Sequence, residues 1–376
     1  MRQRFKIALM VELFARLIFR LRRLMLTETD LNVRRAVSPL LATLILIAIV
    51  VSAGLVVYGI VSGWMGIFGA NLKVQAVSVD LVKAGDKALL SVSIKNVGNK
   101  PLAGIVVTGH DDNGKPFKIA LPPAEPGQVS GNTLVIPLGV SNIVLDASGN
   151  NNHGTLYGSW SWVSDKNFGT CLSLSGGGWA EAYVDVPEYN FTIEVWIKTS
   201  QANQGVFDID WNGHDRHFGV VSSGLIYHRV WTGSGWTGTK AVNDGKWHAW
   251  ALTVKTGEGQ KAYVDAFFAG SFSYDHSDFN WQKTAEIGLS RDFSNRFSGL
   301  IAGVKYYSKP LSEAELQFNI RNPNFPLTEA LVFWYPLAEG NNASYSLTVG
   351  NSYALTVTAY SLDGGFFTVT TAAECR

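Results

Sequence analysis

Acidic and amide side chains alternate in the segment FDIDWNGHD, and they could supply oxygen ligands to a cation. The residues concerned are Asp208, Asp210, Asn212 and Asp215, with Gly213 between the last two. Alternate oxygens with a glycine at the bend match the first half of a calcium-binding loop. The twelfth position of such a loop is Gly219 and not the required bidentate glutamate. We therefore favour a hairpin with solvated acids, and calcium binding is the alternative.

Trp231 and Trp236 lie in the glycine-rich segment HRVWTGSGWTGT, where their rings could stack on a sugar. Exposed rings on a loop are costly unless a ligand covers them. Most of the twelve tryptophans are expected to fill the core of a β-protein, and core packing is the alternative for this pair too. Carbohydrate contact through Trp231 and Trp236 is the functional prediction.

The sequence contains no catalytic motif of a common enzyme class. There is no G-x-S-x-G nucleophile elbow, no G-x-x-x-x-G-K-[ST] phosphate loop and no H-E-x-x-H pair. Carboxylates are plentiful, but a glycosidase pair is defined by a separation in space. We expect a binding or structural protein and not an enzyme.

Two further residue types carry covalent chemistry. Cys171 and Cys375 are the only cysteines, and in an extracellular setting they form either a disulfide or two free thiols. Asn190 and Asn342 each begin an N-glycosylation sequon, which predicts modification if the chain is exported.

A long apolar run organises the N-terminal part of the chain. No Asp, Glu, Lys or Arg occurs between Arg35 and Lys73, and residues 40–60 are almost wholly apolar. About 20 such residues at about 1.5 Å each cross a hydrocarbon core of about 30 Å, and helix is the only economical state there. The sequence therefore predicts a transmembrane or filament-core helix over 36–70, with the long polar region outside the cell.

Residues 1–35 form a basic leader that we expect in the cytoplasm. They hold nine Lys or Arg and three acids, which leaves 22 basic and 27 acidic residues in the remainder, about −5 in charge. That balance excludes nucleic acid as a partner of the exported part by charge. Residues 7–25 are either an amphipathic helix on the inner leaflet or an untranslated stretch, because both Met1 and Met25 are candidate starts.

The start of the apolar helix, Arg35-Ala36-Val37-Ser38-Pro39, resembles the class III signal of archaeal type IV pilins. The resemblance implies that a class III signal peptidase recognises Arg35, Ala36 and Val37. It would cut once, after Arg35 or after Ala36, and leave the helix on the mature protein. It also implies the pilus assembly machinery and other pilin subunits as partners, in a homo-polymer or a mixed filament. Close helix packing would use the glycines Gly54, Gly59 and Gly63.

Beyond residue 70 the apolar period changes to two, which predicts strands. LKVQAVSVDLV and KALLSVSIKNV alternate apolar and polar residues, and Asp112-Asn113-Gly114 is a hairpin signal. The same alternation returns over 345–371. We predict a mainly β protein with a discontinuous β-sandwich head, built from 71–130 and 341–376, which resembles the head of archaeal pilins.

The intervening residues, 131–340, are expected to form an inserted domain. Segments at 146–158, 183–200, 244–254, 261–271 and 297–316 occur in the order of, and resemble, the laminin-G-like, concanavalin-type jelly roll. The opening strand of that family has two candidates, at 134–138 and at 331–340. Ser312 and Glu315 predict a capping box that opens a short helix. Calcium is common in the family, but its ligands vary, so no ligand residue transfers.

These features together favour an archaeal type IV pilus-like subunit or minor pilin that displays a laminin-G-like domain for adhesion or glycan binding. The alternative is a non-polymerising, membrane-anchored extracellular carbohydrate-binding protein. Both place the chain in the cell membrane with extracellular domains, or in an extracellular filament, with cell-surface or extracellular glycans as partners.

Overall fold

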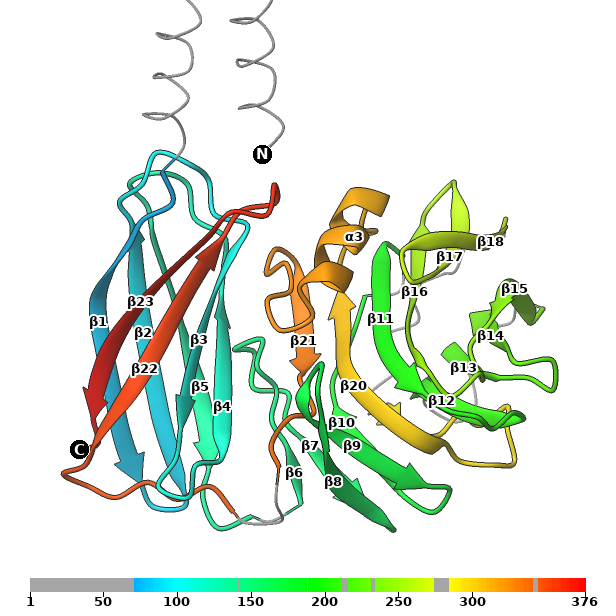
Figure 1. The fold of residues 1–376 in the computed structure, drawn as a ribbon, viewed down its shortest axis with the longest axis horizontal. Helices are drawn as coiled ribbons and strands as arrows, with labels where there is room; N and C mark the ends of the chain where they lie inside the picture. Colours follow the sequence, from blue (N-terminus) through cyan, green and yellow to red (C-terminus); the bar gives the residue numbers. More distant parts are fainter. Residues whose placement is uncertain are drawn as a thin grey trace, which may run out of the picture. The chain divides into compact units, whose positions relative to one another are not determined.

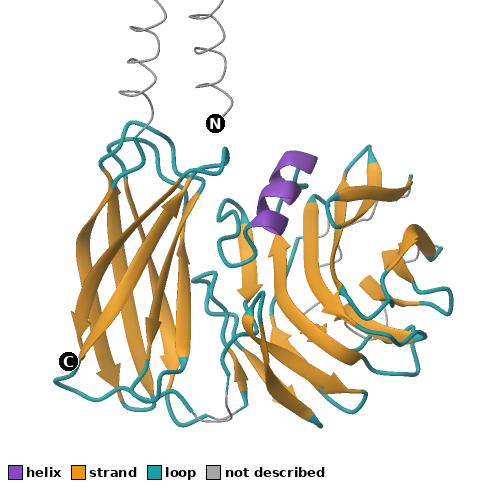
Figure 2. Ribbon diagram, viewed as in Figure 1, coloured by secondary structure: helices purple, strands orange, loops and turns teal. Residues whose placement is uncertain are grey.

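The computed structural model describes residues 71–140, 142–187, 189–210, 216–230, 234–273, 284–340 and 344–376. These residues belong to one compact unit, Ala70–Arg376, and consist of strands and one short helix (Figure 2). The expectation of a mainly β protein is confirmed. The predicted leader, the apolar helix over 36–70 and its residues Arg35, Ala36, Val37, Gly54, Gly59 and Gly63 lie outside the described residues. Within the described ranges, no helix is long and apolar enough to cross a bilayer.

Seven strands from the two ends of the described chain form a β-sandwich, which we call the head. One sheet has the order β1-β2-β5 and the other β23-β22-β3-β4, all antiparallel. In Figure 1 the red β23 and β22 lie beside the blue and cyan strands. The strands are β1 (Val74–Ala84), β2 (Lys87–Asn96), β3 (Gly104–His110), β4 (Pro116–Leu121), β5 (Val129–Pro137), β22 (Ser352–Tyr360) and β23 (Phe366–Glu374).

The alternation in the sequence explains the head core. In β2, Ala88, Leu90, Val92 and Ile94 are buried, whereas the residues between them are mostly exposed or half-buried. Strand side chains alternate between faces, so a period of two buries one face only. The predicted hairpin turn at Asp112-Asn113-Gly114 joins β3 to β4.

The remaining strands form a two-sheet jelly roll. The front sheet has the order β15-β14-β13-β12-β19-β10-β7-β6, and the back sheet β18-β17-β16-β11-β20-β9-β8, with β21 paired to β20. The front strands are β6 (Ile143–Val144), β7 (Gly154–Tyr157), β10 (Trp179–Tyr183), β12 (Gln204–Asp210), β13 (Arg216–Val220), β14 (Leu225–Val230), β15 (Trp236–Ala241) and β19 (Thr284–Ile287). The back strands are β8 (Trp160–Asp165), β9 (Gly169–Ser175), β11 (Phe191–Lys198), β16 (Trp247–Lys255), β17 (Gly259–Val264), β18 (Phe267–Phe272), β20 (Ser298–Tyr307) and β21 (Leu331–Tyr335).

The pairing of β5 bears on where the jelly roll begins. Of the two candidate opening strands, LVFWY over Leu331–Tyr335 pairs with β20 of the back sheet. The other, around Leu134, belongs to β5, which pairs along its length with β2 of the head. β5 therefore crosses the expected boundary at residue 131, because its inward side chains Leu134 and Ile136 complete the head core.

The helix α3 (Glu313–Arg321) covers part of the back sheet and joins it to the head. The predicted capping box is confirmed, since the Ser312 hydroxyl accepts from the Glu315 amide and the Glu315 carboxylate accepts from the Ser312 amide. Phe318 of α3 stacks on Tyr360 of β22 at 5.7 Å between ring centres. The Tyr360 hydroxyl donates to the carbonyl of Pro326. The outer face of the four-stranded head sheet is thus packed against the jelly roll.

Side chains of the segment DASGNNNH complete this junction. The Asn151 carboxamide accepts from the Val135 amide at 2.8 Å, and His153 Nε2 donates to the Val135 carbonyl at 2.6 Å. Asn151 has φ of 61°, a left-handed conformation that asparagine tolerates. The segment therefore satisfies backbone groups on the edge of β5 that would otherwise lack partners.

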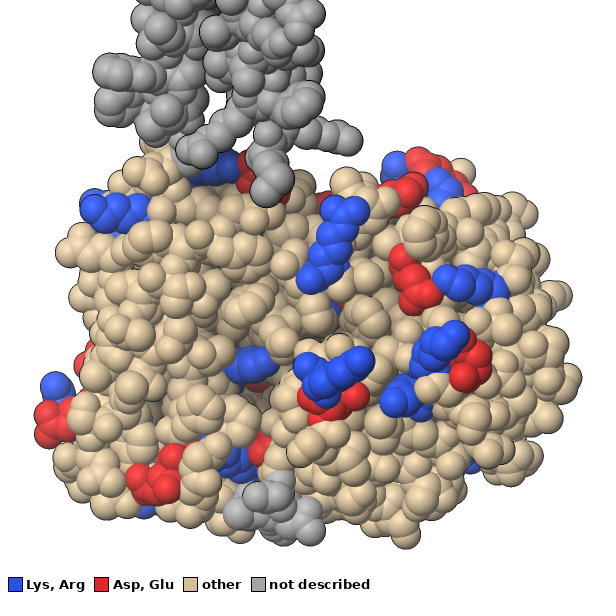
Figure 3. Space-filling model, in the orientation of Figure 1, with Lys and Arg blue, Asp and Glu red and all other residues tan. Residues whose placement is uncertain are grey.

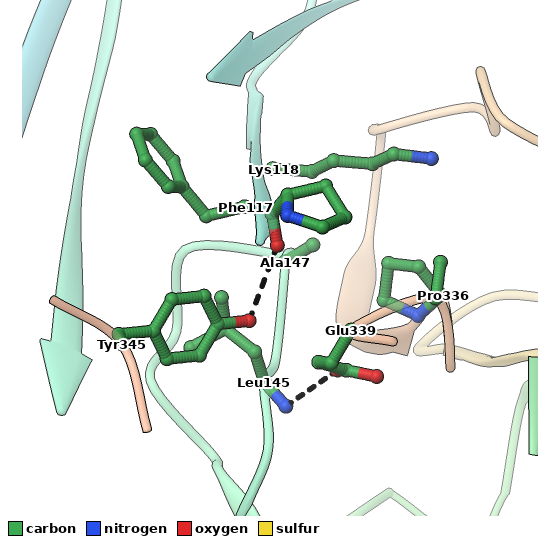
Figure 4. A pocket seen from close by; sticks show the side chains of 9 residues that line it. Phe117, Lys118, Leu145, Ala147, Pro336, Glu339 and Tyr345 are labelled. Carbon is green, nitrogen blue, oxygen red and sulfur yellow. Dashed lines mark hydrogen bonds between the residues drawn. The ribbon is translucent and has the colours of Figure 1, made fainter. Parts of the chain in front are cut away.

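A small buried cavity lies where the chain passes from the jelly roll back to the head (Figure 4). Tyr345 donates to the carbonyl of Pro116 at 3.2 Å, and Glu339 accepts from the amide of Leu145 at 2.9 Å. Burial raises the pKa of Glu339 and lowers that of Lys118 to about 8. The cavity holds at most one water-sized group, so it is a packing feature of the junction.

Of the two alternatives for the cysteines, a disulfide or two free thiols, the structure has the free thiols. Cys171, in β9, and Cys375, at the end of the head, are both buried free cysteines. They belong to different hydrophobic clusters, because Cys171 packs with Phe168 and Ala302 whereas Cys375 belongs to the head core. Burial raises the pKa of the Cys171 thiol to about 11, which makes it unreactive.

Candidate functional site

The outer face of the front sheet carries a continuous row of polar side chains. The register aligns them across six neighbouring strands, in the order Thr155, Glu181, Glu286, Asp208, His217 and Arg229. The residues next to them in each strand face the core between the sheets, among them Leu156, Ala180, Ala285 and Phe218. The alternation that builds the core therefore also builds this outer row.

One half of the row is closed by internal pairing. His217 Nδ1 lies 2.7 Å from an oxygen of Asp208, and the Arg291 amide donates to the other oxygen at 2.7 Å. Nη2 of Arg291 lies 3.7 Å from Glu286. His217 and both carboxylates are buried. These groups are occupied in holding the loop after β19 against the sheet.

The same loop covers the neighbouring strands. Asp292 accepts from the Tyr227 hydroxyl at 3.0 Å and from Arg229 at 2.6 Å. The Phe293 ring packs edge-on against Tyr227, at 5.5 Å between ring centres. Any side chain at Gly219 would collide with the Phe293 ring, so glycine is required for this close approach. The surface over β13 and β14 is therefore filled.

The other half, over β7 and β10, is open to solvent. Tyr183 is 72% exposed and Tyr157 is 40% exposed. Glu181 lies between Trp179 and Tyr183 on the same face, and no hydrogen bond or ion pair holds its carboxylate among the described residues. This open half offers two aromatic rings with a free acceptor between them.

A three-layer stack forms one end of the open half. The Arg296 guanidinium carbon lies 3.9 Å from the centre of the Trp179 ring. Tyr157 stacks on Trp179 with ring centres 5.2 Å apart and an interplanar angle of 21°. Arg296 also donates to the carbonyl of Gly177 at 3.4 Å. Cation–π contact and this hydrogen bond hold the guanidinium in one place.

A polar hollow of about 440 Å³ opens beside Arg296. Three loops meet there, before β10, before β12 and before β20. Its lining consists of Gly176, Gln201, Ala202, Gln204, Ser294, Asn295, Arg296 and Ser298. Its size is within the range of small-ligand sites.

Trp236, one of the two tryptophans predicted to contact a sugar, is not exposed on a loop. Trp236 begins β15 and is half-buried, stacked on His228 at 4.4 Å and on Phe272 at 6.1 Å between ring centres. Its indole N–H donates to Gln260 at 3.0 Å. The expectation of an exposed ring is wrong for Trp236, because core packing against both sheets covers it. Trp231 lies outside the described residues.

The predicted cation ligands are not brought together by the described part of the fold. Asp208 is occupied by His217 and Arg291, as described above. Asn212 and Asp215 lie outside the described residues, as does the side chain of Asp210. Within the described ranges no group of three or more His, Cys, Asp or Glu is placed to hold a metal ion. Calcium binding therefore gains no support from Asp208.

Of the two sequons, only Asn190 lies within the described residues. Asn190 is exposed, and its carboxamide oxygen accepts from the Thr256 amide at 3.1 Å. The sequon residue Thr192 is buried and donates to the carbonyl of Lys309. Modification at Asn190 stays a prediction, as it does at Asn342, which lies outside the described residues.

Sequence reasoning missed Tyr157, Glu181, Tyr183 and Arg296 as site residues. One local signal was present, because GWAEAYVDV alternates and so places Trp179, Glu181 and Tyr183 on one face. Arg296 gave no signal, since its stacking on Trp179 depends on a loop more than a hundred residues away in sequence.

The face shown in Figure 3 carries sparse charges of both signs and no large patch of either.

Comparison with solved structures gives partial likenesses. Domain 4 of the extracellular arabinanase AbnA from Geobacillus stearothermophilus, in complex with arabinotriose, is 16% identical with a TM-score of 0.37, covering 48% of this chain and 97% of that one. A structure of botulinum neurotoxin type C, whose cell entry depends on interaction with two ganglioside molecules, is 15% identical with a TM-score of 0.39. The match covers 46% of this chain and 47% of that one. The chain thus spans about half the length of the neurotoxin structure. No curated protein matches the chain.

A family model matches the middle of the chain. Its description is "Concanavalin A-like lectin/glucanases superfamily", and it covers residues 175–317. This range includes β10, the loop after β19 with Arg296, and the first turns of α3. Residues 175–317 are therefore similar to the concanavalin A-like superfamily, and the jelly roll described above is the fold of this region.

Proposed function

We propose that this chain is a surface-displayed glycan-binding protein, in which the open half of the front sheet holds a polysaccharide. The observation that carries the proposal is the exposure of Tyr157 and Tyr183 on either side of the free Glu181 carboxylate. Large exposed rings on one face indicate a binding surface. Sugar C–H groups pack on tyrosine rings, and a carboxylate accepts hydrogen bonds from sugar hydroxyls.

The spacing suits an extended ligand. Tyr157 lies opposite Trp179, which is four residues from Tyr183 along β10. At about 3.3 Å per residue, the two tyrosines are about 13 Å apart along the strand. An aromatic contact contributes about 0.5–1.5 kcal/mol, so one copy of this site binds weakly.

Display at the cell surface rests on the sequence of the N-terminal segment. The apolar run over 36–70 and its pilin-like start support export, either as a subunit or minor pilin of a type IV pilus-like filament or as a non-polymerising membrane anchor. In a filament, the partners are a class III signal peptidase, the assembly machinery and other pilin subunits. Many copies raise avidity by about 10²–10⁴ without any new contact, which would make a weak site useful for adhesion.

We further propose binding without catalysis. Glu181 is the one free carboxylate of the row, because its neighbours Glu286 and Asp208 are buried and engaged with Arg291 and His217. Glycoside hydrolysis usually needs two carboxyl groups that both reach the substrate. A general acid or base must reach its substrate. The arrangement supports a role in fixing the loop rather than in cleaving a glycosidic bond.

The test uses the full-length protein in detergent and a panel of soluble neutral and acidic polysaccharides. Tyr183→Ala should weaken binding about two- to tenfold, as expected for one lost aromatic contact. Phe267→Ala is the matched control, because Phe267 is 70% exposed but lies on β18 of the back sheet. Equal binding by Tyr183→Ala and the unaltered protein would reject this face as the site.

A further inference from the structure

We infer that the hollow beside Arg296 takes the anionic group of an acidic sugar, either the carboxylate of a uronic acid or a sulfate ester. This inference rests on the proposed function, since it names the class of glycan that the front sheet binds. It also gives the bound glycan an orientation, because the hollow lies beside Arg296, at the Trp179 end of the open half.

The first argument is that Arg296 is held in place before any ligand arrives. Its guanidinium is fixed between the Trp179 ring and the Gly177 carbonyl. Only part of its five N–H donors are used by that hydrogen bond. A planar guanidinium matches the paired oxygens of carboxylate or sulfate, and little side-chain entropy remains to be lost on binding.

The second argument is that the charge of Arg296 is not neutralised. No carboxylate lies within ion-pair distance of Arg296 among the described residues. Two acids of the same region are paired elsewhere, Asp292 with Arg229 and Glu286 with Arg291, and the third, Glu181, forms no ion pair with Arg296. Arg296 is also the one charged group among the described residues that line the hollow.

The third argument is that the rest of the lining suits sugar hydroxyls. Gln204 is buried and supports the wall of the hollow, because its side-chain amide donates to Thr199 at 3.0 Å and its side-chain oxygen accepts from the Ser298 amide at 2.8 Å. The Asn295 amide donates to the Asn203 carbonyl at 3.0 Å, which leaves its oxygen as an acceptor. Gln201 is exposed at the rim. Neutral donors and acceptors around one guanidinium favour a sugar residue with several hydroxyls and one negative charge.

The position of Glu181 fixes the orientation of the ligand. Glu181 is two residues from Trp179, about 7 Å along β10 and on the same face. A ligand anion at Glu181 would meet a like charge, which is unfavourable. The anionic group therefore lies at the Arg296 end, and uncharged hydroxyls lie over Glu181 and Tyr183.

The experiment compares full-length protein with two matched pairs of polymers, polygalacturonate with its methyl ester and dextran sulfate with dextran. Arg296→Gln removes the charge, and Arg296→Lys keeps the charge without the planar fork. Arg321→Gln is the control, because Arg321 is an exposed arginine on α3. Near-ultraviolet circular dichroism checks that the packing of the aromatic side chains as a whole survives each change.

We expect the unaltered protein to bind at least one acidic polymer more tightly than its neutral partner. Arg296→Gln should weaken acidic binding about ten- to hundredfold, the range for a lost charged hydrogen bond, and should weaken neutral binding much less. Arg296→Lys should fall between the two, and Arg321→Gln should match the unaltered protein. Added salt should weaken acidic binding only, and this readout on the unaltered protein is independent of how the variants fold.

Three results overturn the inference, and they are distinguishable. If both members of each pair bind alike while Tyr183→Ala weakens them equally, the acidic-sugar inference fails and the proposed function stands. If the unaltered protein binds none of the four polymers, both fail. Loss of acidic binding in Arg321→Gln to the same extent as in Arg296→Gln would show general charge attraction and would also reject the hollow.

Discussion

A buried ion pair beneath α3 provides a sharp test of how the jelly roll is held together. Glu194 in β11 and Lys305 in β20 lie opposite each other and form an ion pair with neither side chain exposed. Asn319 of α3 donates to Glu194 at 3.0 Å, and its carbonyl accepts from the Leu327 amide at 2.8 Å. Burial, with the charge of Glu194 as the second cause, raises the pKa of the neighbouring Tyr307 well above its usual value.

The perturbation is Lys305→Met, which keeps the length of the side chain and removes its charge. Glu194 is then buried with Asn319 but without a counter-charge, which should cost about 3–5 kcal/mol of unfolding free energy. The double variant Glu194→Gln with Lys305→Met should recover most of that loss, because no buried charge is left unpaired.

The assay is urea unfolding followed by tryptophan fluorescence, which reports on the tryptophan-rich jelly roll. Lys309→Met is the matched control, because Lys309 pairs with Glu315 and Glu329 but is partly exposed, and such pairs contribute about 0–1 kcal/mol. The reasoning is refuted if Lys305→Met costs less than 1 kcal/mol, or if the double variant is no more stable than the single one.

Two other predictions follow. His228 is fully buried, its Nε2 accepts from the Trp250 indole at 2.7 Å, and burial lowers its pKa to about 3. Because the unfolded chain binds this proton at a pKa of about 6.5, the free energy of unfolding should fall as the pH drops below that value. Between pH 6.5 and 4 the unaltered protein should lose about 3 kcal/mol more than His228→Gln, and His110→Gln is the exposed control. The mass of the mature protein should match a start beside Ala36 with the apolar helix retained, whereas a start beyond residue 66 would show an ordinary signal peptide and contradict the pilin-like reading.

Much of the fold could be predicted from local patterns. The period of two in β2, the turn at Asp112-Asn113-Gly114 and the capping box of Ser312 with Glu315 depend on neighbours in sequence, and the structure has all three. The boundary between the head and the jelly roll, expected at residue 131, was harder to predict. β5 and β21 have similar apolar patterns, and only their partners, β2 and β20, distinguish them.

The candidate site was harder to predict, because it depends on contacts between distant segments. Trp236 lies in a glycine-rich segment that is typical of a loop, yet its ring stacks on His228 and Phe272. Asp208 has the spacing of a calcium ligand, yet His217 and the Arg291 amide occupy it. Residue type indicated the kind of chemistry in both cases, and tertiary packing decided whether the group was accessible.

The central claim is that the open half of the front sheet and the adjoining hollow hold the glycan. Hydrogen–deuterium exchange of the full-length protein, with and without saturating polysaccharide, measures this directly. We predict protection in peptides covering β7, β10 and the segment 294–298, with no change in the hairpin between β17 and β18. Protection confined to that hairpin or to the head, with β10 unchanged, would contradict the assignment.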